Sequence, residues 1–430
     1  MALTHSRTQL EDETFKNTHR TSEKDFTRKR SLPFALLMVL IMRKSVKPLQ
    51  NVLNEAMMWL NEPLVTASAY SQARYKLKHT AFIELNQSAI VDTVYSDDEY
   101  HKFWGFRILA VDGSKVVLPN TEKVREEFGT INYSNGKNNE IEGEHPYALA
   151  SVLYDVLNRM AVDARLGRAK AYEVDLAIEH LAHTKAGDLL TMDRNYPSYR
   201  MLAELVHRSR DFVIRCSAAS FAAARKMLKG EGKANQIVTL KPCADQKPLM
   251  QKLGLPMSLK VRFVRVRLST GEYEVLVTSL CDKDLYPTAE FLELYHLRWG
   301  IETFYGLLKT RLELENFTGT QAEAVRQDFH ATVYLTGLES ILTDAAQKQL
   351  DAKNTQFPQR VNRSVSFNAI KHHALELLYG DTEIEILEEK LTALFLMNPT
   401  IVRERRNPPR KKTSARRLLN FHKRQKKHCF

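Results

Sequence analysis

The chain has few cysteines and no long apolar run. Its four cysteines are widely separated, with no CxxC pair, so neither a disulfide framework nor a zinc site is expected: Cys216, Cys243, Cys281 and Cys429. The longest apolar run, residues 34–42, is far shorter than the roughly 20 residues that a membrane-spanning helix needs. Residues 1–30 are polar and mixed in charge, unlike a secretory signal. We therefore expect a cytoplasmic protein with free thiols and no membrane partner.

Positive charge is concentrated near one end of the chain. The formal net charge is +12, and residues 403–427 hold twelve Lys and Arg against one acid, Glu404. The remainder of the chain is therefore close to neutral. Such a basic segment is typically disordered when free and favours polyanions, although a tail that only improves solubility has the same composition. Nucleic acid is the favoured partner.

Residues 1–100 are predicted to form a helical DNA-binding region after about thirty flexible residues. Apolar residues recur at helix spacing from residue 44 to residue 60, and a second helix is expected to begin at Thr66 or Ser68 as its N-cap. Four polar side chains of this second helix are expected to point largely outward: Gln72, Arg74, Lys76 and Lys78. The pair fits a helix-turn-helix DNA reader, but any small helical domain contains similar hairpins.

Residues 101–215 alternate between strand and helix patterns. Strands are predicted at 108–111, 148–156, 160–166, 188–192 and 212–215, and helices at 173–183 and 198–208. An RNase H-like α/β core has this order of elements: three strands, a helix, a strand, a helix and a strand. Asp112 and Asp193 each follow the end of a strand, where α/β folds build their sites.

Residues 216–285 are predicted to form a β-rich insertion, with strands at 236–240, 259–268 and 272–280. In the second strand cations alternate with apolar residues, and a phase slip at Phe263 and Val264 indicates a β-bulge. The basic face, including Arg262 and Arg265, fits a phosphate backbone. An ordinary sheet with solvated arginines fits equally well.

The helix predicted around residue 300 is the most informative stretch. At about 100° per residue, four polar side chains fall within roughly 60° of one another: Tyr295, Arg298, Glu302 and Lys309. A neighbouring stripe is apolar: Leu297, Ile301, Phe304 and Leu308. An acid flanked by cations suits a site for a divalent metal and a phosphate. A buried helix with a solvated salt-bridge face is the alternative.

Three carboxylates stand out by their positions: Asp112, Asp193 and Glu302. In an RNase H-like core the two strand ends are neighbours, and the later helix packs across them. Converging carboxylates suit Mg²⁺, and two ions about 4 Å apart can assist phosphoryl transfer. An isolated Asp after a strand is more often a turn residue. Four competing acids are not selected: Asp155, Asp163, Glu173 and Asp188.

These motifs resemble those of the DDE transposases of bacterial insertion sequences, specifically the insertion-sequence-four family. The signature Y-(2)-R-(3)-E-(6)-K of that family is matched without a spacing error by Tyr295, Arg298, Glu302 and Lys309. The two acid blocks are matched by residues 109–114 (LAVDGS) and 192–198 (MDRNYPS). The similarity runs from about residue 26 to residue 330, and Asn195 replaces a Gly that is common in the family.

The resemblance implies a metal-dependent enzyme that cuts double-stranded DNA at terminal inverted repeats and joins the freed 3′ ends to target DNA. Asp112, Asp193 and Glu302 would be catalytic metal ligands for two Mg²⁺ ions, with Mn²⁺ as a substitute. Tyr295, Arg298 and Lys309 would hold phosphates. Trp299 would stack on a flipped base in a hairpin step, or would be a core residue. The enzyme would work as a homodimer associated with the nucleoid.

Two other functions remain open at this stage: a non-catalytic DNA-binding relative that has lost transposition, and a general RNase H-type nuclease. The predicted organisation has six parts. They are a helical N-terminal region (1–100), an α/β core (101–215), a β-rich insertion (216–285), the catalytic helix of the core (286–330), a helical C-terminal region (331–402) and a basic tail (403–430).

Overall fold

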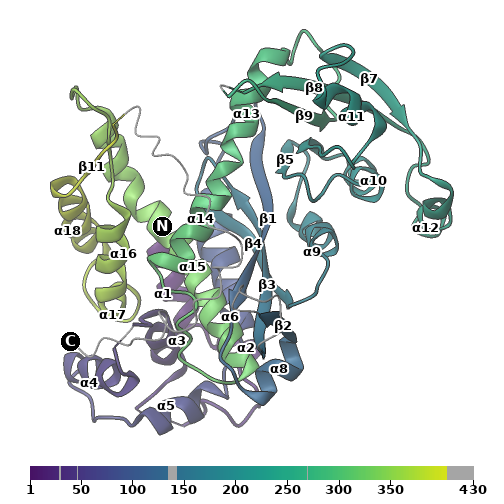
Figure 1. Cartoon of the computed structure of the whole chain (residues 1–430). Coiled ribbons are helices and arrows are strands. Elements are labelled where there is room, and N and C mark those ends of the chain that lie inside the picture. Colours follow the sequence, from purple (N-terminus) through teal and green to yellow (C-terminus); the bar gives the residue numbers. More distant parts are fainter. Residues whose placement is uncertain (29–30, 46, 134–142, 269, 404–430) are drawn as a thin grey trace. The chain divides into compact units, whose positions relative to one another are not determined.

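The computed structural model describes residues 1–28, 31–45, 47–133, 143–268 and 270–403 (Figure 1). The predicted basic tail lies outside the described residues except for Arg403. The chain divides into two compact units. The helical unit comprises Met1–Asp98, Val116–Ala148 and the chain from Gly306 onward, and the sheet unit comprises Glu99–Lys115 and Leu149–Tyr305.

The strands form one large mixed sheet, which confirms the predicted α/β class. Its strands are β1 (Arg107–Val117), β2 (Thr130–Tyr133), β3 (Gly143–Asp155), β4 (Met160–Arg168), β5 (Asp188–Met192), β6 (Asp211–Arg215), β7 (Asn235–Leu240), β8 (Leu259–Arg267) and β9 (Tyr273–Thr278). The strand order is β2-β3-β1-β5-β6-β9-β8-β7, and β4 pairs with β3. All five predicted core strands are present, with ends that differ by a few residues. The largest difference is β1, which continues to Val117 where the sequence predicts an end at Val111.

The strands of the predicted insertion extend this same sheet. β9 pairs antiparallel with β6, and β8 and β7 follow outward. The predicted bulge is wrong, because the pairing of β8 with β9 is continuous from Arg262 to Arg267. Phe263 and Val264 are both fully buried, since Phe263 meets Phe221 on one face and Val264 joins the core cluster on the other. A strand covered on both faces does not alternate between apolar and polar residues.

Six helices follow or accompany the strands of the sheet: α9 (Glu173–His180), α10 (Tyr199–His207), α11 (Ala222–Leu228), α12 (Lys247–Lys252), α13 (Phe291–Leu297) and α14 (Trp299–Thr310). Ser198 caps α10, as its side chain accepts a hydrogen bond from the Met201 amide at 3.2 Å. A core cluster of the sheet unit joins Ile108, Leu189 and Val213 of three neighbouring strands to Phe291 and Leu294 of α13. This apolar contact fixes α13 across the strands that carry the two predicted aspartates.

The helical unit is built mainly from helices: α1 (Ala2–Glu11), α2 (Glu13–His19), α3 (Phe34–Met42), α4 (Leu49–Trp59), α5 (Ala67–Arg74), α6 (Thr80–Asn86), α7 (Asp92–Val94), α8 (Glu122–Phe128), α15 (Ala322–Asp351), α16 (Arg363–His372), α17 (Ala374–Leu378) and α18 (Ile384–Met397). The expectation that the first thirty residues are flexible is wrong for α1 and α2, because Leu3 and Phe15 are buried. The long helix α15 packs against α3, α6 and α18. None of the described helices is both long and apolar enough to cross a membrane.

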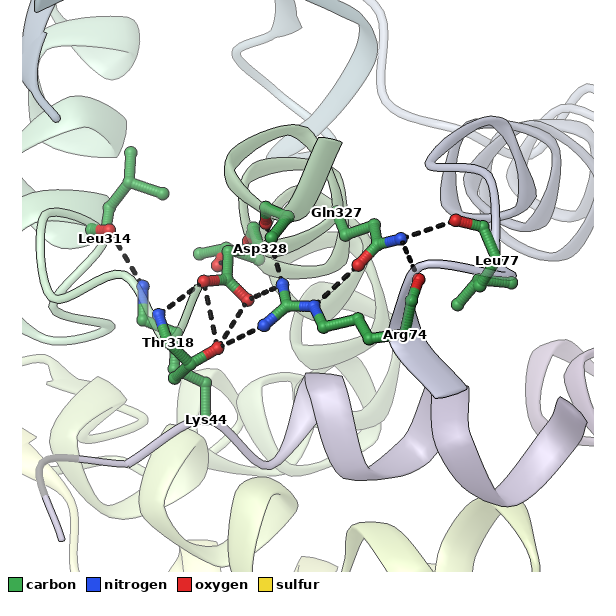
Figure 2. A network of polar contacts seen from close by, with 9 residues as sticks. Lys44, Arg74, Leu77, Leu314, Thr318, Gln327 and Asp328 are labelled. Carbon is green, nitrogen blue, oxygen red and sulfur yellow. Dashed lines mark hydrogen bonds and ion pairs between the residues drawn. The ribbon is translucent and has the colours of Figure 1, made fainter. Parts of the chain in front are cut away.

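The second predicted N-terminal helix, α5, begins at the predicted cap: the Thr66 hydroxyl accepts from the Ala69 amide at 3.1 Å. Its last residue departs from the prediction, because Arg74 is buried and not directed outward. The Arg74 guanidinium bonds Asp328 Oδ1 and Gln327 Oε1 of α15, each at 2.6 Å (Figure 2). Arg74 therefore joins α5 to α15 and is not available to DNA.

A buried lysine lies beside this network. The Lys44 ammonium donates to the Leu314 carbonyl oxygen at 2.8 Å (Figure 2). Burial lowers the pKa of Lys44 to about 8, although the carboxylate of Asp328 opposes this shift. Lys44 lies 5.0 Å from the centre of the Phe317 ring, so a cation–π contact contributes to holding the ammonium in an otherwise costly position.

Candidate active site

Two parallel strands bring Asp112 and Asp193 together. β1 and β5 pair from Arg107 with Asp188 to Val111 with Met192, so Asp112 and Asp193 are the next residues in register. Neighbouring strands lie about 4.8 Å apart, which makes the two acids neighbours at the point where β5 ends and β1 continues. Asp112 Oδ1 accepts from the Gly113 amide, and Asp193 Oδ1 accepts from the Asn195 amide, each at 2.8 Å. Each carboxylate is thus oriented by the backbone of its own loop or strand.

The charges around Asp112 show which groups are its neighbours. Burial, together with the negative charges of Asp193 and Glu302, raises the pKa of Asp112 to about 7. The Gly113 amide and the Arg298 guanidinium oppose this shift. The three predicted acids therefore lie in one electrostatic neighbourhood. Among the described residues, no three acid, histidine or cysteine side chains converge closely enough to form a metal-binding group in this arrangement.

The raised pKa predicts a pH-dependent loss of stability. Because folded Asp112 binds its proton more tightly than the unfolded chain, whose value is near 3.8, stability falls as pH rises from about 4 to about 7. The Asp112→Asn variant lacks this ionisation. In EDTA, we expect the difference in melting temperature between variant and wild type to move in favour of the variant as pH rises through that window, as measured by calorimetry. Asp381→Asn, at an exposed carboxylate, is the control, and an Asp112→Asn profile parallel to wild type would contradict the prediction.

The signature helix is divided in two at Arg298. The Arg298 amide bonds the Tyr295 carbonyl at 3.2 Å and the Ile301 amide bonds the Arg298 carbonyl at 3.1 Å, both over three residues instead of four. This tighter turn separates α13 from α14. The predicted apolar stripe is buried at Ile301, Phe304 and Leu308.

Helix α14 is held tightly against the strands of the sheet unit. The Phe304 ring lies 4.5 Å from the Tyr154 ring of β3, centre to centre. The Tyr305 hydroxyl contacts the carbonyl oxygens of Asp112 at 2.9 Å and Ala150 at 3.0 Å. A Cβ on Gly300 would lie only 3.2 Å from Val156 Cβ, so glycine permits this close approach.

The polar residues of the signature differ in exposure. Tyr295 and Arg298 are each only 3% exposed, whereas the Glu302 side chain is 39% exposed. Arg298 Nη2 donates to Glu302 Oε1 at 2.7 Å, and its guanidinium lies 5.6 Å and 5.3 Å from the rings of Tyr295 and Trp299. Arg298 Nε is buried and has no hydrogen-bond partner among the described residues. The alternative of a solvated salt-bridge face does not describe this helix, because Tyr295 and Arg298 are buried and Glu302 is partly exposed.

The remaining signature residue, Lys309, lies near the end of α14 and is partly buried. It belongs to the portion of the chain assigned to the helical unit, while Tyr295, Arg298 and Glu302 belong to the sheet unit. The helix itself is continuous from Trp299 to Thr310.

A fourth acid, Glu173 at the start of α9, lies beside the two aspartates. A Cβ on Gly113 would lie 3.2 Å from Glu173 Oε1, and burial together with the charge of Asp193 raises the pKa of Glu173. A hydrogen bond with Asn195 opposes that shift. Glu173 is one of the competing acids named from the sequence and not selected. Its neighbour Gly113 lies on β1, sixty residues earlier in the chain.

Tyr196 also borders this site. Its side chain is fully buried, and its hydroxyl has no hydrogen-bond partner among the described residues. Burial and the nearby charges of Asp112 and Glu173 raise the pKa of its hydroxyl. The site therefore contains a neutral phenol as well as four acids.

The two arginines predicted on a basic strand face have other partners. Arg262 is fully buried, and its guanidinium donates to the Tyr286 carbonyl oxygen at 2.8 Å and to Asn235 Oδ1 at 3.0 Å. Arg265 donates to the Glu231 carbonyl oxygen at 3.0 Å and lies 4.9 Å from the Tyr273 ring. Both side chains therefore hold together β7–β9 and the loops beside these strands. In this arrangement Arg262 has no surface to offer a phosphate backbone.

Comparison with known proteins defines the class. Residues 103–335, more than half of the chain, match the family described as the transposase DDE domain. The chain belongs to this family, which confirms the predicted DDE transposase class and a general function in DNA transposition. Over 312 residues it is 25% identical to transposase InsG for insertion sequence element IS4 of Escherichia coli (strain K12), covering 70% of this chain and 67% of that one.

One solved structure has a weaker sequence similarity to this chain. The piggyBac transposase in its synaptic complex with hairpin DNA aligns with a TM-score of 0.45 and 8% sequence identity. The alignment covers 92% of this chain and 85% of that chain.

Proposed function

We propose that this protein is an active transposase of an insertion sequence. It would cut double-stranded DNA at terminal inverted repeats and transfer the freed 3′ ends to target DNA, moving the element by cut and paste. The observation that supports this most directly is the register of β1 and β5, which makes Asp112 and Asp193 neighbours. Glu302 and Arg298 lie within electrostatic range of Asp112.

The residues fit a hard divalent cation. Every candidate ligand is a carboxylate oxygen, the donor type that Mg²⁺ and Mn²⁺ prefer. The pKa of Asp112 is raised first by burial and then by the charges of Asp193 and Glu302, so a bound cation would stabilise the ionised carboxylate. Asp112, Asp193 and Glu302 would hold two Mg²⁺ ions, with Mn²⁺ as a substitute. When bound, the ions would neutralise charge on the phosphodiester and activate the attacking oxygen.

Glu302 and Arg298 have to change partners for this role. Glu302 is now bonded to Arg298 at 2.7 Å, and its partial exposure leaves it free to adopt other rotamers. A carboxylate that leaves Arg298 exposes guanidinium donors, and guanidinium groups bind phosphate oxygens well. Tyr295 and Lys309 would hold further phosphates. Trp299 would stack on a base displaced from the DNA end, as its partly exposed ring allows.

The wider organisation follows from the same proposal. The strands and helices of residues 101–215 and 286–330 would form an RNase H-like core, residues 216–285 an insertion between its parts, and residues 1–100 and 331–402 helical regions that assist DNA binding. The basic tail, residues 403–430, would bind DNA through its charge. A homodimer in the cytoplasm, associated with the nucleoid, would hold two element ends.

Purified protein with a DNA fragment that carries both element ends tests the proposal. We expect Mg²⁺-dependent nicking at the repeats, measured on sequencing gels, and joining of the new 3′ ends to a target plasmid. Tight binding to the ends without nicking would indicate a non-catalytic DNA-binding relative. Cleavage that does not depend on the repeats would indicate a general nuclease.

A further inference from the structure

A cavity of about 480 Å³ lies within the helical unit, lined by residues from the ends of α3 and α14, from α4 and from α16. Five basic side chains line it: Arg43, Lys47, Arg311, Lys371 and His372. The acids in its lining are Glu55 and Glu313. Positive charge therefore exceeds negative charge even with the histidine neutral. None of these residues belongs to the signature or to the three acids.

Most of this positive charge has no close counter-ion. Lys47 pairs with Glu55 at 2.7 Å. In the described chain, none of Arg43, Arg311 and Lys371 forms an ion pair or a side-chain hydrogen bond, and Arg43 Nη1 is buried without a partner. Burial lowers the pKa of both Arg43 and Lys371, against the opposing charges of Glu55 and Glu313. Arg43 and Lys371 are therefore held where hydration is reduced and pairing is incomplete, while Arg311 is exposed.

Helix ends explain how the protein tolerates these charges. Arg43 and Arg311 directly follow the last residues of α3 and α14, and Lys371 lies in the last turn of α16. A helix C-terminus carries a partial negative charge of about one half, which stabilises a nearby cation without neutralising it. The remaining positive charge stays available to a ligand in the cavity.

Neutral polar groups complete the lining. Ser45, Ser364 and Asn368 supply hydroxyl and amide groups that can donate hydrogen bonds. Val52 and Phe367 supply a buried apolar surface. The volume lies within the range of about 300–1,000 Å³ typical of sites that enclose small molecules. An anion with an attached apolar group fits this combination better than a bare cation or an apolar ligand.

We propose that this cavity binds phosphate groups of a DNA strand, as a phosphodiester site outside the catalytic centre. The identification of the polymer as DNA rests on the proposed function, whereas the affinity for phosphate rests on the cavity alone. Arg43, Lys371 and Arg311 would pair with phosphate oxygens, and Val52 and Phe367 would contact the sugar.

Lys371→Met tests the phosphate chemistry, because methionine keeps the length of the side chain and removes the charge. Without added anions, we expect the variant to melt at a higher temperature than wild type, since an incompletely paired cation is gone. With pyrophosphate as the probe, we expect affinity at least about tenfold weaker by calorimetric titration. Arg311→Gln, at an exposed position, is expected to weaken pyrophosphate binding as well. Lys390→Met, at an exposed lysine of α18, is the control and is expected to change neither quantity.

A second binding experiment, with duplex DNA, distinguishes a DNA phosphate from a free phosphate compound. In Lys371→Met and Arg311→Gln, the log–log salt dependence of duplex binding is expected to become shallower by about 0.9 for each phosphate that the variant no longer neutralises. Weaker pyrophosphate binding with an unchanged salt slope would replace DNA by a free phosphate compound and overturn the proposal. Wild-type affinity of both variants for both probes would overturn the site altogether. These binding assays do not require cleavage, so they stand apart from the test of the catalytic function.

Discussion

Replacing Glu302 by Gln is expected to abolish Mg²⁺-dependent nicking at the element ends while DNA affinity changes little. Gln keeps the Oε1 atom that accepts the 2.7 Å hydrogen bond from Arg298, so the local structure is retained. It removes the negative charge that a divalent cation needs. Because changes one shell further out from a metal cost about 10- to 100-fold, loss of a direct ligand is expected to lower the nicking rate by at least about 100-fold.

The matched control for this variant is Glu293→Gln, which neutralises an exposed acid on the preceding helix α13. Nicking is followed on sequencing gels and affinity by fluorescence anisotropy with the same labelled DNA end. We expect Glu293→Gln to behave as wild type in both assays. Normal nicking by Glu302→Gln would exclude this residue from the catalytic site, and joint loss of nicking and binding would mean that it acts in DNA contact instead.

Replacing Arg74 by Met is expected to lower the free energy of unfolding by about 3–5 kcal/mol. Arg74 and Asp328 are 4% and 0% exposed in their side chains, and their atoms Nη2 and Oδ1 lie 2.6 Å apart (Figure 2). Removal of the arginine leaves the Asp328 carboxylate buried with only its bonds to Thr318. Urea unfolding followed by circular dichroism, with hydrogen exchange of α15, measures the effect.

Two further variants separate the buried charge from lost packing. Lys348→Met removes a cation from an exposed ion pair with Asp344 on the same helix α15, and is expected to change stability by no more than about 1 kcal/mol. Arg74→Met combined with Asp328→Leu is expected to recover part of the stability lost in Arg74→Met, since no charge remains buried. A double variant as unstable as the sum of its single variants would attribute the loss to packing.

Local sequence patterns were enough to select Asp112 and Asp193 as neighbours in the sheet. A short apolar strand followed by an acid is visible in the sequence at Asp112 and at Asp193. The predicted strand end at Val111 was wrong, since β1 continues through Asp112 to Val117, whereas Asp193 does follow the end of β5. The two acids are neighbours because β1 and β5 pair in parallel, with Val111 opposite Met192. The Thr66 cap was predictable for a similar reason: the hydroxyl and the amide that it bonds are three residues apart.

Long basic side chains were predicted less well. Arg74 reads as a solvent-facing residue because its partner Asp328 is 254 residues away. Arg262 reads as part of a basic face because the carbonyl groups that bond it belong to a later loop. Glu173 was not selected for the same reason, since its neighbour Gly113 lies on a different element, β1. Spacing along one element cannot reveal a partner on another.

The pairing of β6 with β9 means that the predicted insertion, residues 216–285, is not a separate module. Leu276 of β9 and Val264 of β8 share one apolar cluster with Ile108, Leu189 and Val213. Deleting residues 216–285 would remove the β8 and β9 side chains from that cluster. It would also leave the backbone amides and carbonyls on one side of β6 unpaired, so that β6 could pair with another chain. Residues 216–285 thus supply the edge strands of the sheet. A variant that lacks them would need another cover for β6 to avoid aggregation.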